Sequence, residues 1–238
     1  MYLRLVPFTF CVILISLVSL KPAFAGMGQQ KFGIYITGLK IGELTYAMNS
    51  KGLNYAVRGI IEATGLVGAI TKFHFDATAF GKMYKGRHHT QKYTETSNNG
   101  KRVNTKKIVY KNGVPNLTYS EPLEDYWVRP SQQKGTVDPM TAIMVLLADQ
   151  PKNSSCRLAM DIYDGARRFS IKLTKKIVSD YELICEGTYT KIAGYSKKEW
   201  AKGNEFPFEI QYTLKDNSHK VQRLVMSTSH GRTSFIRR

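Results

Sequence analysis

The sequence predicts a mainly β protein: a curled antiparallel sheet, closed or half-closed as a barrel, around one buried helix near residues 138–148. Three observations support this prediction. Short segments alternate apolar and polar residues, turn-forming pairs separate those segments, and a single long apolar run breaks the rhythm. Roughly ten or eleven short strands are expected, and curling such a sheet removes most of its exposed edges. A two-sheet sandwich is the alternative architecture.

The alternation is clearest in residues 206–214, where every second side chain is apolar. Alternate side chains point to the same face of a strand, so this segment has one apolar and one polar face. It is therefore predicted to be a half-buried strand. The apolar positions of this segment and of four similar ones are Phe206, Phe208, Ile210, Tyr212 and Leu214; Phe32, Ile34 and Ile36; Leu44, Tyr46 and Met48; Leu53, Tyr55 and Val57; and Phe169, Ile171 and Leu173.

Turn-forming residues separate these segments. Asn112-Gly113 and Asp164-Gly165 supply the positive φ angle that tight hairpin turns require. Most neighbouring strands are therefore expected to pair antiparallel. Further turn signals occur at residues 50–52, 98–100 and 216–218.

One segment has the pattern of a helix. Asp138 is suited to cap a helix, Pro139 to occupy its first turn, and residues 140–148 form a nearly continuous apolar run. The segment is predicted to be a buried helix of about ten residues. A weaker helical turn is expected at residues 65–71, which are rich in glycine.

The N-terminal residues have the pattern of a secretory signal peptide. Arg4 precedes an apolar run over residues 5–20, and Ala23-Phe24-Ala25 forms a small-x-small cleavage site. We expect cleavage after Ala25, which leaves residues 26–238 as a single β-rich domain exported to the periplasm. A retained transmembrane anchor is the alternative, but the run is short for a bilayer span. No second apolar stretch of spanning length follows, so the mature protein is expected to be soluble.

The cysteines support the same compartment. Cys11 lies in the apolar N-terminal run, and only Cys156 and Cys185 remain in the body of the chain. In an oxidising compartment these two have a single intramolecular connectivity, so we predict a Cys156–Cys185 disulfide. No Cys-x-x-Cys motif is present, which favours a structural bond over a redox-active one.

The chain is strongly basic, with a formal charge of +17 that falls to +15 when Arg4 and Lys21 are removed with the signal peptide. For an exported protein the available anions are anionic lipid, lipopolysaccharide and acidic wall polymers, whereas nucleic acid is not an expected partner. The basic residues occur as scattered pairs, which is more typical of solvated strand faces than of one binding stripe. The candidate anion-binding residues are Lys106, Lys107, Arg167 and Arg168.

Arg167 follows the Asp164-Gly165 turn and shares the strand face of Phe169, so its side chain is a candidate to point inward. A guanidinium that points inward requires an anionic or carbonyl partner, and Asp161 or a bound anion would serve. A salt bridge at the end of the strand is the simpler interpretation.

No catalytic residues, cofactor or metal are predicted. Ser131 and Lys134 fit a Ser-x-x-Lys pattern, but its Ser-Asp-Asn and Lys-Thr-Gly companions do not occur. Glu124 and Asp125 are adjacent, so on a strand they face opposite ways and do not flank one bond.

A metal site was considered for His74 and Asp76, which share one strand face, together with His88 or His89. The opposite face of that strand is apolar, so His74 and Asp76 are more simply explained as its polar face. The adjacent His88 and His89 point to opposite faces of any strand, which argues against a shared ion.

Several motifs together resemble a known family. These motifs are residues 38–42, 138–142, Cys156 with 161–168, and Cys185 with 192–195. They are similar to the bacterial exported proteins grouped as domain of unknown function 3108, over nearly the whole mature chain. The resemblance implies a Gram-negative periplasmic protein and little about activity. Ala166 interrupts the arginine run usual in that family. By looser analogy, a curled sheet enclosing a helix looks like the lipoprotein-carrier proteins of the periplasm.

These observations lead to one hypothesis and two rivals. The leading hypothesis is a non-catalytic envelope protein whose cationic exterior docks on anionic envelope components. The first rival is a carrier of lipid or lipoprotein acyl chains, which an apolar cavity of several hundred Å³ would favour. The second rival is a cell-wall-directed enzyme, which requires converging polar groups with perturbed pKa values.

Overall fold

The computed structural model describes residues 28–70, 72–120, 122–228 and 231–238. The predicted signal peptide, its cleavage site after Ala25 and Cys11 lie outside the described residues. Within the described ranges, no helix is both long enough and apolar enough to cross a membrane.

The described residues form mostly β-strands. The strands are β1 (Gly28–Ile36), β2 (Leu39–Lys51), β3 (Asn54–Ala63), β4 (Phe73–Tyr84), β5 (Arg87–Asn99), β6 (Val103–Lys111), β7 (Val114–Tyr119), β8 (Gln150–Pro151), β9 (Leu158–Tyr163), β10 (Arg168–Val178), β11 (Glu182–Ala193), β12 (Glu205–Lys215), β13 (Ser218–Thr228) and β14 (Gly231–Arg237). The helices are α1 (Gly65–Ile70), α2 (Pro139–Leu146), α3 (Lys197–Trp200) and the 3₁₀ turn η1 (Pro130–Gln132).

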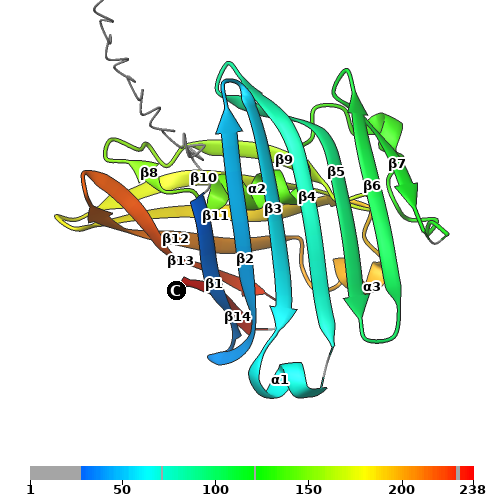
Figure 1. Cartoon of the computed structure of the whole chain (residues 1–238), viewed down its shortest axis with the longest axis horizontal. Coiled ribbons are helices and arrows are strands. Elements are labelled where there is room, and N and C mark those ends of the chain that lie inside the picture. The colour runs from blue at the N-terminus through cyan, green and yellow to red at the C-terminus, as the bar shows by residue number, and fades with distance from the viewer. Residues whose placement is uncertain (1–27, 71, 121, 229–230) are drawn as a thin grey trace, which may run out of the picture.

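All strands belong to one antiparallel sheet with a simple order. From one edge the order is β7 to β1, then β14, and then β13 back to β9, while β8 pairs with β13. Figure 1 shows β1–β7 running steeply across the front and β9–β13 crossing behind them, with α2 between the two halves. The predicted curled antiparallel sheet around a helix is therefore confirmed. The number of strands exceeds the ten or eleven expected.

The sheet is half-closed, because β7 and β9 are its two edges and do not pair with each other. The connection between them bridges the gap. Val128 N–H donates to Ala166 O at 3.0 Å, and Gly135 N–H donates to Gly113 O at 3.0 Å. Val137 forms a parallel bridge with Ile162 of β9. These bonds give the edges of the sheet partners without a closing strand pair.

The core lies between the two halves of the sheet and around α2. Most of the inward positions predicted for the strands are buried, including Phe32, Leu44, Val57 and Ile210, whereas Leu53 lies just before β3 and is exposed. α2 packs against β3, β4, β5 and β9. The helix begins as predicted, since the Asp138 side chain accepts a hydrogen bond from the backbone N–H of Thr141.

The turns follow the predicted chemistry. Asn112 and Gly113 have φ angles of 51° and 76°, and Gly165 has a φ of 96°. Such left-handed conformations favour Asn and Gly, so these residues fix the strand connections. The weak helical turn expected from residue 65 is α1, whereas Thr71 lies outside the described residues.

The short helix α3 was not predicted. Ser196 and Glu199 form a capping box in which each side chain bonds the other's backbone N–H. The Ser-x-x-Glu spacing is visible in the sequence, but Lys197-Lys198 was interpreted only as a charged pair.

Candidate functional site

The predicted anion-binding residues already contact carboxylates of the chain in three of four cases. Lys106 Nζ lies 3.4 Å from Glu95 Oε2. Arg167 Nη2 lies 2.9 Å from Glu199 Oε1, and its guanidinium packs over the Tyr195 ring. These contacts neutralise much of the local charge that an external anion would meet.

Arg168 pairs with Asp161. The partner suggested for Arg167 thus belongs to its neighbour, while the half-exposed Arg167 side chain pairs with Glu199. The β10–β11 ladder also has a register shift between Arg168 and Phe169, so strict alternation of faces does not hold at this strand end. The ion pairs at this strand end agree with the simpler interpretation.

The structure brings two of these segments together. A Cβ atom placed on Gly165 would lie 2.6 Å from Lys106 Cδ, so the Lys106 side chain crosses the turn that precedes Arg167. Lys107, by contrast, is exposed on β6. The four residues therefore do not form one unpaired cationic pocket.

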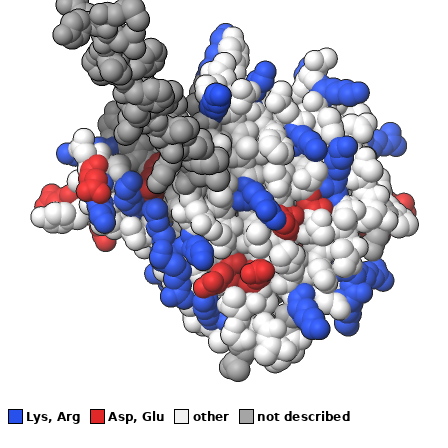
Figure 2. All heavy atoms as spheres, in the orientation of Figure 1, with Lys and Arg blue, Asp and Glu red and all other residues white. Residues whose placement is uncertain are grey.

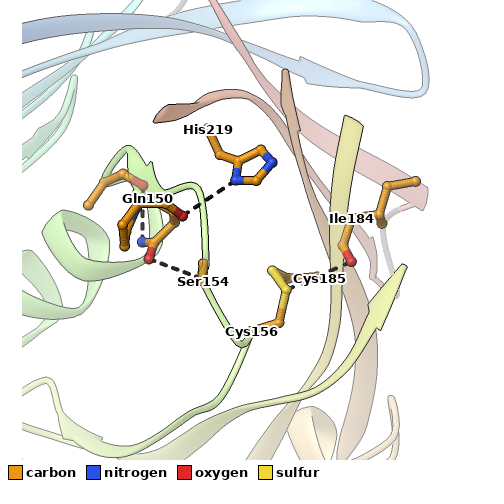
Figure 3. The surroundings of a disulfide bond; sticks show 8 residues. Gln150, Ser154, Cys156, Ile184, Cys185 and His219 are labelled. Atoms are coloured by element: carbon orange, nitrogen blue, oxygen red, sulfur yellow. Dashed lines mark hydrogen bonds between the residues drawn. A yellow bond between two sulfur atoms is a disulfide. The ribbon is translucent and has the colours of Figure 1, made fainter. Parts of the chain in front are cut away.

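The predicted disulfide is present. Cys156 and Cys185 are bonded, with 5.3 Å between their Cα atoms, and both are buried. Figure 3 shows that the bond ties the loop before β9 to β11. The disulfide thus anchors one end of residues 149–157, a segment that we call the strap.

The other end of the strap is held by charge and by β8. Asp149 Oδ1 accepts hydrogen bonds from Arg237 Nη1 at 2.7 Å and from the backbone N–H of Val221 at 3.0 Å. β8 pairs with β13, and His219 Nδ1 lies 3.4 Å from Pro151 O (Figure 3). The strap is therefore fixed to β11, β13 and β14, which belong to the half of the sheet formed by β9–β14.

An apolar cleft of about 380 Å³ opens where the β2–β3 and β4–β5 hairpins approach the C-terminal end of α2. We call it the mouth cleft. Met83 N–H donates to Leu53 O at 2.7 Å and so joins the two hairpins. The Tyr46 hydroxyl donates to Leu147 O at 2.8 Å and holds the end of the helix against β2. Its wall includes Met48, Leu53, Tyr55, Met83, Met144 and Ala148.

Polar groups beneath the mouth cleft satisfy one another. The Tyr55 hydroxyl lies 2.9 Å from Thr141 Oγ1, and Thr90 Oγ1 donates to Asp138 Oδ2 at 2.6 Å. Burial raises the pKa of the Asp138 carboxyl above its ordinary value and raises the pKa of Tyr55 to about 12. Asp138 is inaccessible to solvent, so its position suits a helix cap rather than contact with a substrate.

His88 is the titratable group in the wall of the mouth cleft that changes charge nearest to neutral pH. Its ring packs edge-on against Tyr55, with 5.3 Å between ring centroids. Burial lowers the pKa of His88 below its ordinary value of 6.5. The imidazole is therefore neutral at pH 7 and adds no charge to the cleft.

The two hairpin tips beside the mouth cleft combine basic and exposed apolar side chains. We call these residues the rim. Leu53, Met83 and Tyr84 are 58%, 45% and 55% exposed, although all three are large and apolar. No Asp or Glu occurs in residues 44–61 or 77–94, which are the parts of the two hairpins nearest their turns. The rim consists of Lys51, Leu53, Lys82, Met83, Tyr84, Lys85 and Arg87.

The surface charge elsewhere is mixed. Figure 2 shows Lys and Arg spread over the visible face, with Asp and Glu between them at its centre and lower part, but not near the upper hairpin ends. The rim was missed because the sequence argument considered only adjacent basic pairs. Long segments without an acidic residue, centred on predicted turns, were the signal that would have revealed it.

The candidate metal ligands His74 and Asp76 each contact a different charged residue in the structure. Asp76 is engaged by Arg58, whose Nη2 lies 2.6 Å from Asp76 Oδ2, and His74 Nδ1 lies 3.4 Å from Glu62. Across the described part of the chain, no group of three or more His, Cys, Asp or Glu side chains is arranged to hold a metal ion.

Fold and site together define a class: a half-closed, barrel-like β protein with a disulfide-anchored strap and an apolar cleft under a cationic rim. No family model matches the sequence, and no curated protein matches it. The structure is similar to the crystal structure of a beta-barrel-like protein of the domain of unknown function DUF1849 from Brucella abortus. That similarity has a TM-score of 0.45 at 12% identity and covers 88% of this chain and 95% of that chain. These comparisons do not identify domain of unknown function 3108.

Proposed function

We propose that the protein is a non-catalytic envelope protein that docks on an anionic membrane surface through its rim. The observation that carries the proposal is the rim's composition: Lys51, Lys82, Lys85 and Arg87 lie with exposed Leu53, Met83 and Tyr84 at the hairpin ends, and residues 44–61 and 77–94 contain no acidic residue. Basic residues attract acidic head groups, and the apolar side chains gain by leaving water.

The electrostatic attraction to an anionic membrane is expected to be stronger at the rim than at Lys106, Arg167 and Arg168. Each Lys or Arg near an anionic membrane contributes about 1 kcal/mol. Lys106, Arg167 and Arg168 must share their charge with Glu95, Glu199 and Asp161. Lys107 remains a candidate contact outside the rim.

Sedimentation with vesicles tests this proposal. Mature protein is expected to sediment with vesicles that contain phosphatidylglycerol or lipopolysaccharide and to stay in solution with pure phosphatidylcholine vesicles. Binding should fall steeply as salt shortens the Debye length below about 8 Å.

Charge reversal identifies the contact surface. The double variant Lys82→Glu, Lys85→Glu should lose most of its binding. The matched control is Lys197→Glu, Lys198→Glu on α3, which lies toward the lower ends of β5 and β6 in Figure 1, whereas the β2–β3 and β4–β5 turns lie at the top. Lys107→Glu tests the remaining predicted residue without disturbing the Lys106–Glu95 pair.

The results discriminate among the alternatives. Equal losses in the rim and α3 variants would show that net charge, and not the rim, governs docking. Salt-insensitive binding to neutral vesicles would refute the electrostatic proposal and favour the amphiphile carrier. Absence of binding to any envelope component would refute both binding hypotheses and favour a wall-directed enzyme or a protein that binds another protein.

Export to the periplasm and membership in domain of unknown function 3108 are part of the proposal. The Cys156–Cys185 disulfide supports an oxidising compartment. Mass spectrometry of protein recovered from a Gram-negative periplasm should give a chain that begins at Gly26. A chain retained in the cytoplasm with reduced cysteines would contradict the proposal.

A further inference from the structure

We propose that the mouth cleft binds one acyl chain of an anionic amphiphile, with the head group held at the rim. This inference rests on the proposed docking for its biological setting, but the binding itself does not require a membrane. The docking proposal assigns no function to the mouth cleft, and the present inference gives it a class of ligand.

The chemistry of the lining selects an apolar chain. Met48, Met83 and Met144 lie in the wall together with Leu53 and Val145. Methionine side chains are flexible and polarizable, so a wall rich in them adapts to a chain that has no fixed shape. The volume of about 380 Å³ lies near the lower end of the range for small-molecule sites, which suits one chain rather than a lipid with several.

The polar groups at the base offer little to a polar ligand. The Tyr55 hydroxyl is engaged by Thr141, and Asp138 is engaged by Thr90 and Thr141. His88 is neutral at pH 7 because burial lowers its pKa. A ligand with a charged or strongly hydrogen-bonding body would lose its hydration there without replacement, whereas a hydrocarbon body would not.

The charge around the opening selects the head group. The parts of both hairpins nearest the cleft, residues 44–61 and 77–94, lack acidic residues, and Lys51, Lys85 and Arg87 lie at or beside the turns. Leu53 and Met83 belong both to the rim and to the cleft wall. A chain inserted past these two residues therefore leaves its head group among cations, which favours a carboxylate, sulfate or phosphate.

A fluorescent fatty acid measures this binding without vesicles. Dansyl-undecanoic acid, used below its critical micelle concentration, should show saturable fluorescence enhancement with the mature protein. Myristate should displace it. Myristyl alcohol should also compete, but more weakly, because it keeps the chain and lacks the negative charge.

A cleft-filling substitution locates the site. Ala148→Phe places a ring in the mouth cleft and should weaken probe binding by about tenfold or more. The matched control is Ala201→Phe, an exposed position at the end of α3, which should bind as the wild type does. If Ala148→Phe does not fold, as judged by circular dichroism, Met83→Trp on the exposed side of the cleft replaces it.

The inference fails if the probe does not bind saturably, or if Ala148→Phe and Met83→Trp both bind it normally. Its failure is distinct from failure of docking. Ala148→Phe should still sediment with anionic vesicles, and Lys82→Glu, Lys85→Glu should lose docking yet still bind myristyl alcohol. If Ala148→Phe and the Lys82→Glu, Lys85→Glu variant are both folded and each loses both vesicle docking and amphiphile binding, the cleft and the rim do not act as separate sites.

Discussion

Replacing Asp138 with alanine should destabilise the protein by about 2–4 kcal/mol, well beyond the usual loss of a helix cap. The carboxylate is fully buried and accepts three hydrogen bonds. Two come from Thr141, through its backbone N–H at 3.0 Å and through its hydroxyl, and the third comes from the Thr90 hydroxyl at 2.6 Å.

The magnitude follows from those contacts. Loss of an N-cap costs about 0.5–2 kcal/mol, and each buried donor left without a partner adds about 1–3 kcal/mol. The Thr141 hydroxyl can turn to Tyr55, so its loss is small. Burial disfavours the charged form of Asp138, as its raised pKa shows. Removing the carboxylate therefore offsets part of the loss in stability.

Urea unfolding followed by tryptophan fluorescence measures the effect. Asp138→Asn is the matched control, since asparagine caps helices well and carries no charge. A cost for Asp138→Ala within about 0.5 kcal/mol of zero would refute the reasoning, because it would place Asp138 outside the folded core.

The same pair of variants has a defined pH dependence. The pKa of the Asp138 carboxyl is raised in the folded state. The folded protein therefore holds the proton of this carboxyl more tightly than the unfolded chain does. The stability that protonated Asp138 contributes is fully present below the ordinary pKa of 3.8, and it is lost as the pH rises through the higher pKa that this carboxyl has in the folded protein. The wild type should therefore lose stability relative to Asp138→Asn as pH rises from 3.8. A relative gain would contradict this assignment.

Three further predictions concern stability, each read from urea unfolding. Cys156→Ser opens a loop of 29 residues and should cost about 2–5 kcal/mol, and dithiothreitol should then have no further effect. Leu146→Ala removes a buried side chain of α2 and should cost about 2–5 kcal/mol, whereas an effect below 1 kcal/mol would place that side chain outside the core. Ser196→Ala should cost about 1 kcal/mol through loss of the α3 capping box, and Ser196→Asp should restore most of it.

Local structure was predictable from the sequence because its causes are local. The alternation in residues 206–214 places Phe208, Ile210 and Tyr212 in the core, as predicted. The Asp138 cap and the Asn112-Gly113 turn were likewise readable, since each depends on residues within one turn of the chain.

The site was not predictable by the same means. Tyr55 and Thr141 meet although they are 86 positions apart in the chain, and no periodicity encodes that contact. The register shift between Arg168 and Phe169 was not predicted either, because bulges leave little trace in a single sequence. The rim was within reach of sequence reasoning, because the absence of acids from residues 44–61 and 77–94 needs no structure to see.

The pairing of β1 with β14 has a consequence for how the chain folds. Along the main path of the sheet, this is the one pairing between strands that are not consecutive in the chain. Each half of the sheet is therefore assembled from local hairpins, which form with a small loss of chain entropy, while the join between Phe32 and Arg237 closes a very long loop. We expect the two halves to acquire structure separately and the join to form last. In pulse-labelling hydrogen exchange, those amides of residues 33–36 and 233–236 that donate across the β1–β14 join should gain protection after those of the β4–β5 hairpin.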